Sequence, residues 1–285
     1  MSADAVGTAP VVAVTPDGLS PAVWAHALTG APVWDPASVG DGPLLVLSAH
    51  PDDETIGFGR SIARWARTSG PVDLLTLTAG EACLDAITRS SPFPLPTVTR
   101  AAIGNLRRDE FTRAGAALGV RSTRCRDLPD SALADFPYRV VVELDCAVSR
   151  CRPVLLAAPW ASDPHPDHAA VGAAAAEVAA RHSIPLVEYP VWASFWKHPP
   201  RDEATSARLS LLPADPVDED RREAAIRCYP SQYSSFFAGL GPVVPDSMLE
   251  HHRRAFAFRP HDSVRPDDSV RPHDSVRPHD SGDFL

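Results

Sequence analysis

The stretch from Pro43 to Glu54 reads PLLVLSAHPDDE. Its first half is a short, continuous apolar run, which is typical of a strand buried on both faces of a parallel sheet. The run ends in a turn, and the apolar spacing from Glu54 to Arg67 predicts a helix. A buried strand that feeds a helix is the repeating unit of an open α/β sheet.

The same alternation continues along the chain. We expect further strands within residues 71–78, 125–128, 153–159, 185–195 and 209–213, and helices over 98–119, 136–150, 168–182 and 217–228. This order predicts a Rossmann-like α/β fold: a mostly parallel sheet with helices on both faces, in a single domain over residues 43–258. Sheets of this kind bind ligands at the carboxyl ends of their strands.

The two ends of the chain differ from this pattern. Residues 1–42 are expected to form an N-terminal extension with one short helix near 21–28. From residue 259 a hexapeptide repeats as RPHDSV, RPDDSV, RPHDSV and RPHDSG. Each unit has little to bury and its proline opposes a helix, so residues 259–285 are expected to be a disordered tail.

The composition excludes several classes of protein. The formal net charge is −9, from 27 Lys and Arg against 36 Asp and Glu, which argues against a nucleic-acid partner. No apolar run approaches the roughly 20 residues of a membrane span. The first residues, MSADAVGTAPVVAV, lack the pattern of a signal peptide, so we expect a cytoplasmic protein without a membrane partner. The five cysteines contain no CxxC pair and are expected to be reduced thiols.

Two polar segments follow apolar strands and concentrate His and Asp in a turn. They are AHPDDE at 49–54 and DPHPDH at 163–168. A catalytic zinc ion takes three ligands from His and Asp or Glu and keeps one position open. His50, Asp53 and one histidine of the second segment can supply that set. The alternative is that the acidic residues only cap a helix and that the second segment is a solvated loop.

The neighbouring residues suit hydrolysis at such an ion. Zinc lowers the pKa of its water towards ~7, and a carboxylate that does not bind the metal can accept the water proton. Asp52 is placed for that role. A second histidine can stabilise the oxyanion or protonate a leaving amine, and Asp167 can orient a histidine. Fe²⁺ is the alternative metal.

At these residues the sequence resembles the PIG-L/LmbE-type zinc-dependent N-deacetylases. The resemblance rests on AHPDDE and on HPDH about 110 residues after it, and it covers about residues 43–235. It includes Arg107-x-x-Glu110 and the late segment ending in Ser231-Gln232. The resemblance implies that His50, Asp53 and His168 are the zinc ligands.

The resemblance also implies roles for the remaining motif residues. Asp52 matches the general base, His165 the histidine that assists the tetrahedral intermediate, and Asp167 its neighbour in the motif. The expected reaction is the removal of an acetyl group from an N-acetylated amino sugar, of the N-acetylglucosamine type, or from a related small molecule. The high Ala and Pro content is typical of high-GC actinobacterial proteins, which favours thiol-cofactor or antibiotic (secondary-metabolite) biosynthesis.

Two substrate contacts are predicted with an alternative for each. Arg107 could bind substrate hydroxyls, or it could lie on a solvated helix face. Trp192 could stack on a sugar ring, or it could belong to the hydrophobic core. Two other functions stay open: a deacylase of a non-sugar amide, and a metal-dependent ligand-binding protein without catalysis.

Overall fold

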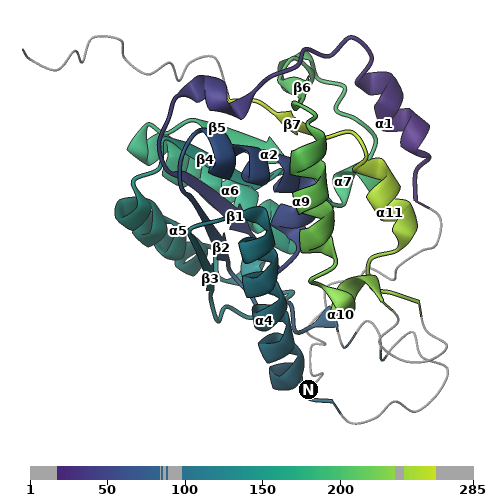
Figure 1. The fold of residues 1–285 in the computed structure, drawn as a ribbon. Coiled ribbons are helices and arrows are strands. Elements are labelled where there is room, and N and C mark those ends of the chain that lie inside the picture. Colours follow the sequence, from purple (N-terminus) through teal and green to yellow (C-terminus); the bar gives the residue numbers. More distant parts are fainter. Residues whose placement is uncertain (1–17, 84, 86–87, 89–97, 235–240, 261–285) are drawn as a thin grey trace, which may run out of the picture.

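The computed structural model describes residues 18–83, 85, 88, 98–234 and 241–260. A seven-stranded sheet in the order β3-β2-β1-β4-β5-β7-β6 lies at its centre (Figure 1). The strands are β1 (Leu44–Ser48), β2 (Val72–Thr76), β3 (Ser122–Cys125), β4 (Leu155–Pro159), β5 (Leu186–Tyr189), β6 (Leu209–Leu211) and β7 (Phe256–Phe258). The strands from β3 to β5 are parallel, and β7 is antiparallel to both of its neighbours.

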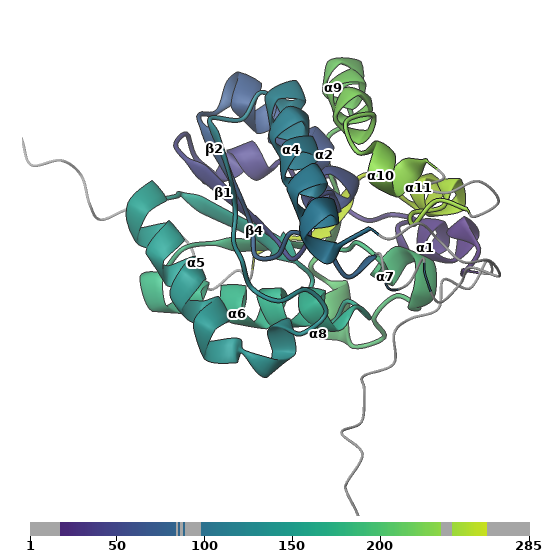
Figure 2. The same ribbon diagram turned by 90° about the horizontal axis from the view of Figure 1, so that it is seen from below.

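Helices cover both faces of the sheet (Figure 2). On one face lie α2 (Asp53–Thr68), α4 (Arg100–Leu118) and α9 (Pro216–Ile226); on the other lie α5 (Pro137–Cys151) and α6 (Pro166–His182). The shorter helices are α1 (Pro21–Ala27), α7 (Ala193–Trp196), α8 (Glu203–Ser206), α10 (Pro230–Tyr233) and α11 (Asp246–His251), with 3-10 turns at Pro36–Val39 and Leu133–Asp135. The predicted single α/β domain with a mostly parallel sheet is confirmed.

The central strands explain why the sheet forms where it does. Every residue of β1, β2 and β4 is buried, so their apolar side chains pack on helices above and below the sheet. Burying each Leu or Val side chain fully contributes about 1.5–3 kcal/mol of transfer free energy. One core cluster joins the sheet to α2, α4 and α9, and a second joins it to α5 and α6.

Residues 18–42, which we expected to precede the domain, pack against it. Trp24 of α1 is 2% exposed, its ring centroid lies 5.2 Å from that of Phe256, and its Nε1 donates to the Lys197 carbonyl over 2.8 Å. Val33 forms a β-bridge with Leu211. The helix expected near 21–28 is therefore present as α1, and the boundary drawn at residue 42 remains a prediction.

Several element boundaries differ from the expectations. Strand β3 ends at Cys125 instead of beginning there, and the apolar stretch after β5 turns into α7 because Asp163 accepts hydrogen bonds from the backbone at 191 and 193. Strand β7 lacked a sequence prediction; it is only three residues long. The tail predicted to be disordered from residue 259 begins with an ordered residue, since the Arg259 N–H donates to the Arg208 carbonyl over 2.9 Å; residues 261–285 lie outside the described residues. No helix in the described part of the chain is long and apolar enough to cross a bilayer.

Candidate metal centre

The turn between β1 and α2 brings the first polar segment into the site. Asp52 is the residue before the helix, with a φ of 111° in the left-handed region, which is strained for a residue with a side chain. Its carboxylate makes no capping hydrogen bond. Asp53 closes the turn instead, because its Oδ2 accepts from the backbone N–H groups of Ala49 (3.1 Å) and His50 (2.9 Å). Simple helix capping is therefore the wrong interpretation of Asp52.

The side chains of three residues from the two segments meet. His50 Nδ1 lies 3.4 Å from Asp53 Oδ2, Asp53 Oδ1 lies 3.1 Å from His168 Nε2, and His168 Nε2 lies 3.3 Å from His50 Nδ1. All three residues are buried. Ligands about 2.0–2.1 Å from a tetrahedral zinc ion lie roughly 3.3–3.4 Å from each other. Asp53 meets the two histidines through different oxygens, and the His-Asp-His donor set fits a divalent metal ion.

The other nitrogen of each of these imidazoles faces carboxylates. His50 Nε2 lies 3.1 Å from Asp130 Oδ1 and 3.3 Å from Asp167 Oδ2. His168 Nδ1 lies 3.0 Å from Asp163 Oδ1. A carboxylate on the far nitrogen fixes the tautomer and the ring orientation that a metal ligand needs. The predicted placement of Asp167 beside a histidine agrees with this geometry.

The charge of the cluster also suits a cation. Five aspartates are buried together, at positions 52, 53, 130, 163 and 167. Burial alone would lower the pKa of His168, but the charges of Asp53 and Asp163 outweigh it and raise the pKa to about 9. Burial raises the pKa of Asp53, and the facing histidines His168 and His50 reverse this and hold it well below its usual value. The buried aspartates therefore favour a positive charge at this place, which a bound cation would also supply.

Asp52 and Arg107 lie against each other beside these atoms. Arg107 is 3% exposed; its Nη2 donates to the Pro51 carbonyl (2.6 Å) and to Asp52 Oδ1 (3.3 Å), and its Nη1 donates to the Gly80 carbonyl (2.7 Å). The alternative of a solvated helix face is therefore wrong for Arg107. Its Nε has no partner among the described residues. Burial raises the pKa of Asp52 to about 8, against the charge of Arg107.

His165 lies next to both histidines and is partly exposed. Its ring centroid is 4.8 Å from that of His50 and 4.6 Å from that of His168. Its Nδ1 accepts from the backbone N–H of Asp167 over 3.3 Å, so the ring proton sits on Nε2. Burial and the two neighbouring histidines lower the pKa of His165 to about 3. The neutral ring can therefore donate a hydrogen bond from Nε2.

Glu54 and Glu110 explain two further parts of the sequence pattern. Glu54 Oε1 accepts from the Tyr229 hydroxyl (2.8 Å), and its Oε2 accepts from the Asp52 backbone N–H (3.2 Å). Glu110, on the same helix as Arg107, accepts from the backbone N–H of Ser231 (3.0 Å) and from its hydroxyl (2.5 Å). The late Tyr-Pro-Ser-Gln segment is thus held to both α2 and α4.

Trp192 lies on the turn that follows β5. The N–H groups on either side of it, from Val191 and Ala193, donate to Asp163 Oδ2 over 3.0 and 2.9 Å. Its ring stacks on that of Trp196 with centroids 4.2 Å apart, and it is half-buried against the core. The core alternative therefore holds for part of its surface, and the substrate contact stays a prediction.

Sequence reasoning assigned no role to Asp130 or Asp163. Asp130 follows β3, so the rule that polar residues at strand ends form the site would have found it if applied to that strand. Asp163 stands in the second segment itself, five residues before His168. The five-residue spacing alone does not show that Asp163 forms a hydrogen bond with Nδ1 of His168.

Comparisons with known proteins relate the chain to a family of deacetylases. The family model described as GlcNAc-PI de-N-acetylase (PIG-L) matches residues 45–179. A protein of Rhodococcus erythropolis, named 1D-myo-inositol 2-acetamido-2-deoxy-alpha-D-glucopyranoside deacetylase, is 30% identical over 223 residues, which cover 72% of each chain. The chain belongs to the PIG-L family.

Two other relatives of this PIG-L chain match over different lengths. A Thermobifida fusca protein with the same name as the Rhodococcus one is 38% identical over 84 residues, and that match spans 30% of this chain and 29% of the T. fusca protein. The crystal structure of an A40926 pseudoaglycone deacetylase shares the fold, with a TM-score of 0.52 and 23% identity over 69% of this chain and 84% of that one. Both segments of the metal centre lie within the family match.

Proposed function

We propose that this PIG-L protein is a metal-dependent hydrolase that removes the acetyl group from an N-acetylated amino sugar or a related small molecule. The observation that carries the proposal is the meeting of His50 Nδ1 and His168 Nε2, 3.3 Å apart, with the Asp53 carboxylate, whose Oδ2 lies 3.4 Å from the first and whose Oδ1 lies 3.1 Å from the second. These three side chains would hold the ion. We propose Zn²⁺, with Fe²⁺ as the alternative.

A zinc ion supplies two things in such a site: it makes a water molecule acidic and it polarises the amide carbonyl. Asp52 accepts the proton of the attacking water, since its carboxylate is buried beside the ligands and held by Arg107. Once it has taken up this proton, Asp52 can pass it to the departing amine. Water and the amide give acetate and the free amine.

His165 and the aspartates around the histidines complete the mechanism. The neutral His165 ring donates from Nε2 to the oxygen that becomes negative in the tetrahedral intermediate. Asp167 holds His165 through its backbone N–H and contacts His50 through its carboxylate, so it positions both rings. Asp130 and Asp163 orient the two histidine ligands.

The proposed substrate class rests on the relatives. The Rhodococcus and Thermobifida proteins are named for a 2-acetamido-2-deoxy-glucopyranoside, which is an N-acetylated amino sugar. The half-buried Trp192 ring offers a stacking face for a sugar, and Arg107, which holds the turn at Pro51 beside the metal centre, is the other proposed substrate contact. We place the reaction in thiol-cofactor or secondary-metabolite biosynthesis. All five cysteines are free, which suits the reducing cytoplasm as its location.

Acetate release tests the proposal directly. The full chain, loaded with Zn²⁺, is incubated with an N-acetylglucosaminyl inositol, simple N-acetylglucosamine glycosides and N-acetylated amines without a sugar. We expect acetate from the sugars, and loss of metal and turnover in His168→Ala but not in His182→Ala, at the exposed end of the same helix. Acetate from the non-sugar amides alone would favour the alternative deacylase. Metal-dependent binding of a sugar without acetate release would favour a non-catalytic binding protein.

A further inference from the structure

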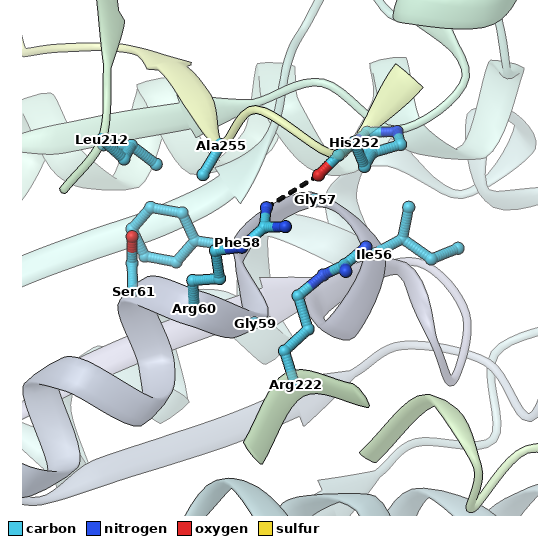
Figure 3. A pocket seen from close by; sticks show the side chains of 10 residues that line it. All are labelled: Ile56, Gly57, Phe58, Gly59, Arg60, Ser61, Leu212, Arg222, His252 and Ala255. Atoms are coloured by element: carbon cyan, nitrogen blue, oxygen red, sulfur yellow. Dashed lines mark hydrogen bonds between the residues drawn. The ribbon is translucent and has the colours of Figure 1, made fainter. Parts of the chain in front are cut away.

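A small pocket lies between α2, α9 and the segment that leads into β7 (Figure 3). Arg60 of α2, Arg222 of α9 and His252 are among the residues that line it. The pocket is small and partly open, and it has room for a water molecule or a monatomic ion.

Arg222 enters this pocket with two unpaired donors. Its side chain is 5% exposed, and its Nη1 donates to Glu219 Oε1 over 3.2 Å. Its Nε and Nη2 have no hydrogen-bond partner among the described residues. The buried Tyr233 hydroxyl, which interacts electrostatically with Arg222, also lacks a partner there. Buried donors are nearly always paired in folded proteins, so an acceptor is expected beside this guanidinium.

The charges around the pocket do not balance. The Arg60 side chain is 10% exposed, forms an ion pair with the same Glu219, and donates from Nη1 to the His252 carbonyl over 2.7 Å. Two guanidinium groups therefore share one carboxylate. His252 adds no charge to the pocket, because burial and the nearby Arg222 lower the pKa of its imidazole to about 3 and keep it neutral. Asp218, on the same helix, is paired with Arg67.

We propose that the pocket binds a monatomic anion, chloride under cellular conditions, between Arg222 and Arg60. A chloride ion accepts hydrogen bonds from several donors and offsets the excess positive charge, whereas a water molecule could do only the first. None of the residues that line the pocket is a proposed metal ligand, so the site is distinct from the proposed metal centre. The anion would join α2, which begins at the metal-centre residue Asp53, to α9.

Bromide diffraction tests the site on the unmodified chain. Crystals soaked in bromide are measured at the bromine absorption edge. We expect an anomalous peak within hydrogen-bond distance of Arg222 Nε or Nη2. A pocket that holds only water, or no density, overturns the proposal.

Thermal unfolding tests whether the site is built into the fold. Chloride is exchanged for gluconate at constant ionic strength, and the melting temperature is expected to rise with chloride by about 2–4 °C. Arg222→Leu should abolish this dependence, and Arg227→Leu, at a side chain 68% exposed just after α9, should keep it. If Arg222→Leu does not fold, the chloride series on the unmodified chain decides. A bromide peak without any chloride dependence would mean binding at crystal concentration only and would also overturn the proposal.

Discussion

Asp163 holds His168 through a hydrogen bond of 3.0 Å between its Oδ1 and the imidazole Nδ1. Its Oδ2 accepts from the backbone N–H groups of Val191 and Ala193. One buried carboxylate thus joins a proposed metal ligand on α6 to the turn after β5. Because this turn carries Trp192, the orientation of the ligand and the position of a predicted substrate contact depend on the same side chain.

The first prediction follows from this contact. Asp163→Ala removes the group that orients His168 and leaves two buried N–H donors unpaired, so metal affinity should fall about 10–100-fold. Competition with a fluorescent chelator measures the change. Asp145→Ala, which removes an exposed carboxylate paired with Arg181 and His182, is the control and should bind metal normally. Equal affinities in the two variants would contradict the positioning role.

The second prediction separates the two adjacent aspartates. Asp53→Ala should lose both metal and activity, because Asp53 is a proposed ligand. Asp52→Ala should keep the metal and lose about 10²–10⁴-fold in kcat, because only proton transfer is removed. Metal analysis and steady-state kinetics on the same preparations distinguish the outcomes. If the metal is lost from Asp52→Ala and kept by Asp53→Ala, the two roles are reversed.

The third prediction concerns acid stability and His252. Its buried imidazole has a pKa of about 3, against 6.5 for an unperturbed histidine, and its Nε2 lies 3.0 Å from the Val191 carbonyl. Between these pH values the unfolded chain binds the extra proton, so this group destabilises the fold as the pH falls from 6.5 towards 3, by up to about 1.4 kcal/mol per pH unit. Urea unfolding at pH 7, 6 and 5 should show a smaller loss in His252→Gln than in the unmodified chain. Parallel pH slopes would rule out this source of acid sensitivity.

The fourth prediction concerns Gly172 on α6. A Cβ atom there would lie 2.6 Å from the Ala161 Cα and from the Pro159 carbonyl oxygen, both of them backbone atoms. Alanine favours a helix by about 1 kcal/mol over glycine, but overpacking of this kind costs about 1–3 kcal/mol. Gly172→Ala should therefore lower the free energy of unfolding and, by displacing α6, weaken metal binding at His168. Gly104→Ala is the control, since its nearest neighbour would be the Ala79 side chain at 3.2 Å.

The strands that were predicted well are those buried on both faces. β1 and β4 are nearly continuous apolar runs and β2 is one interrupted by Asp73; each is followed by turn residues and is too short for a typical helix. β7 could not be predicted because its three residues pair with β6 and β5 only through distant contacts. The packing of the N-terminal segment on the domain could not be predicted for the same reason. Trp24 is buried by contact with Phe256, which lies far along the chain.

At the candidate site, residue type and strand-end position predicted which side chains gather. They did not predict how each side chain is used. The burial of Arg107 and its bonds to Pro51 and Gly80 depend on the close approach of two turns, which the helical pattern of α4 does not encode. Asp130 was missed because its approach to His50 depends on how β3 and its following loop lie beside β1, a relationship that exists only after the sheet has formed.

His50 and His168 are separated by 118 residues and follow two strands, β1 and β4, that are neighbours in the sheet. The complete ligand set therefore cannot exist on a nascent chain until α6 has left the ribosome and β4 has paired with β1. Metal uptake is then a step that follows synthesis of more than half the protein. In a cell short of the ion, folded chains would lack the stabilisation that metal binding adds, so they would unfold and be degraded more often.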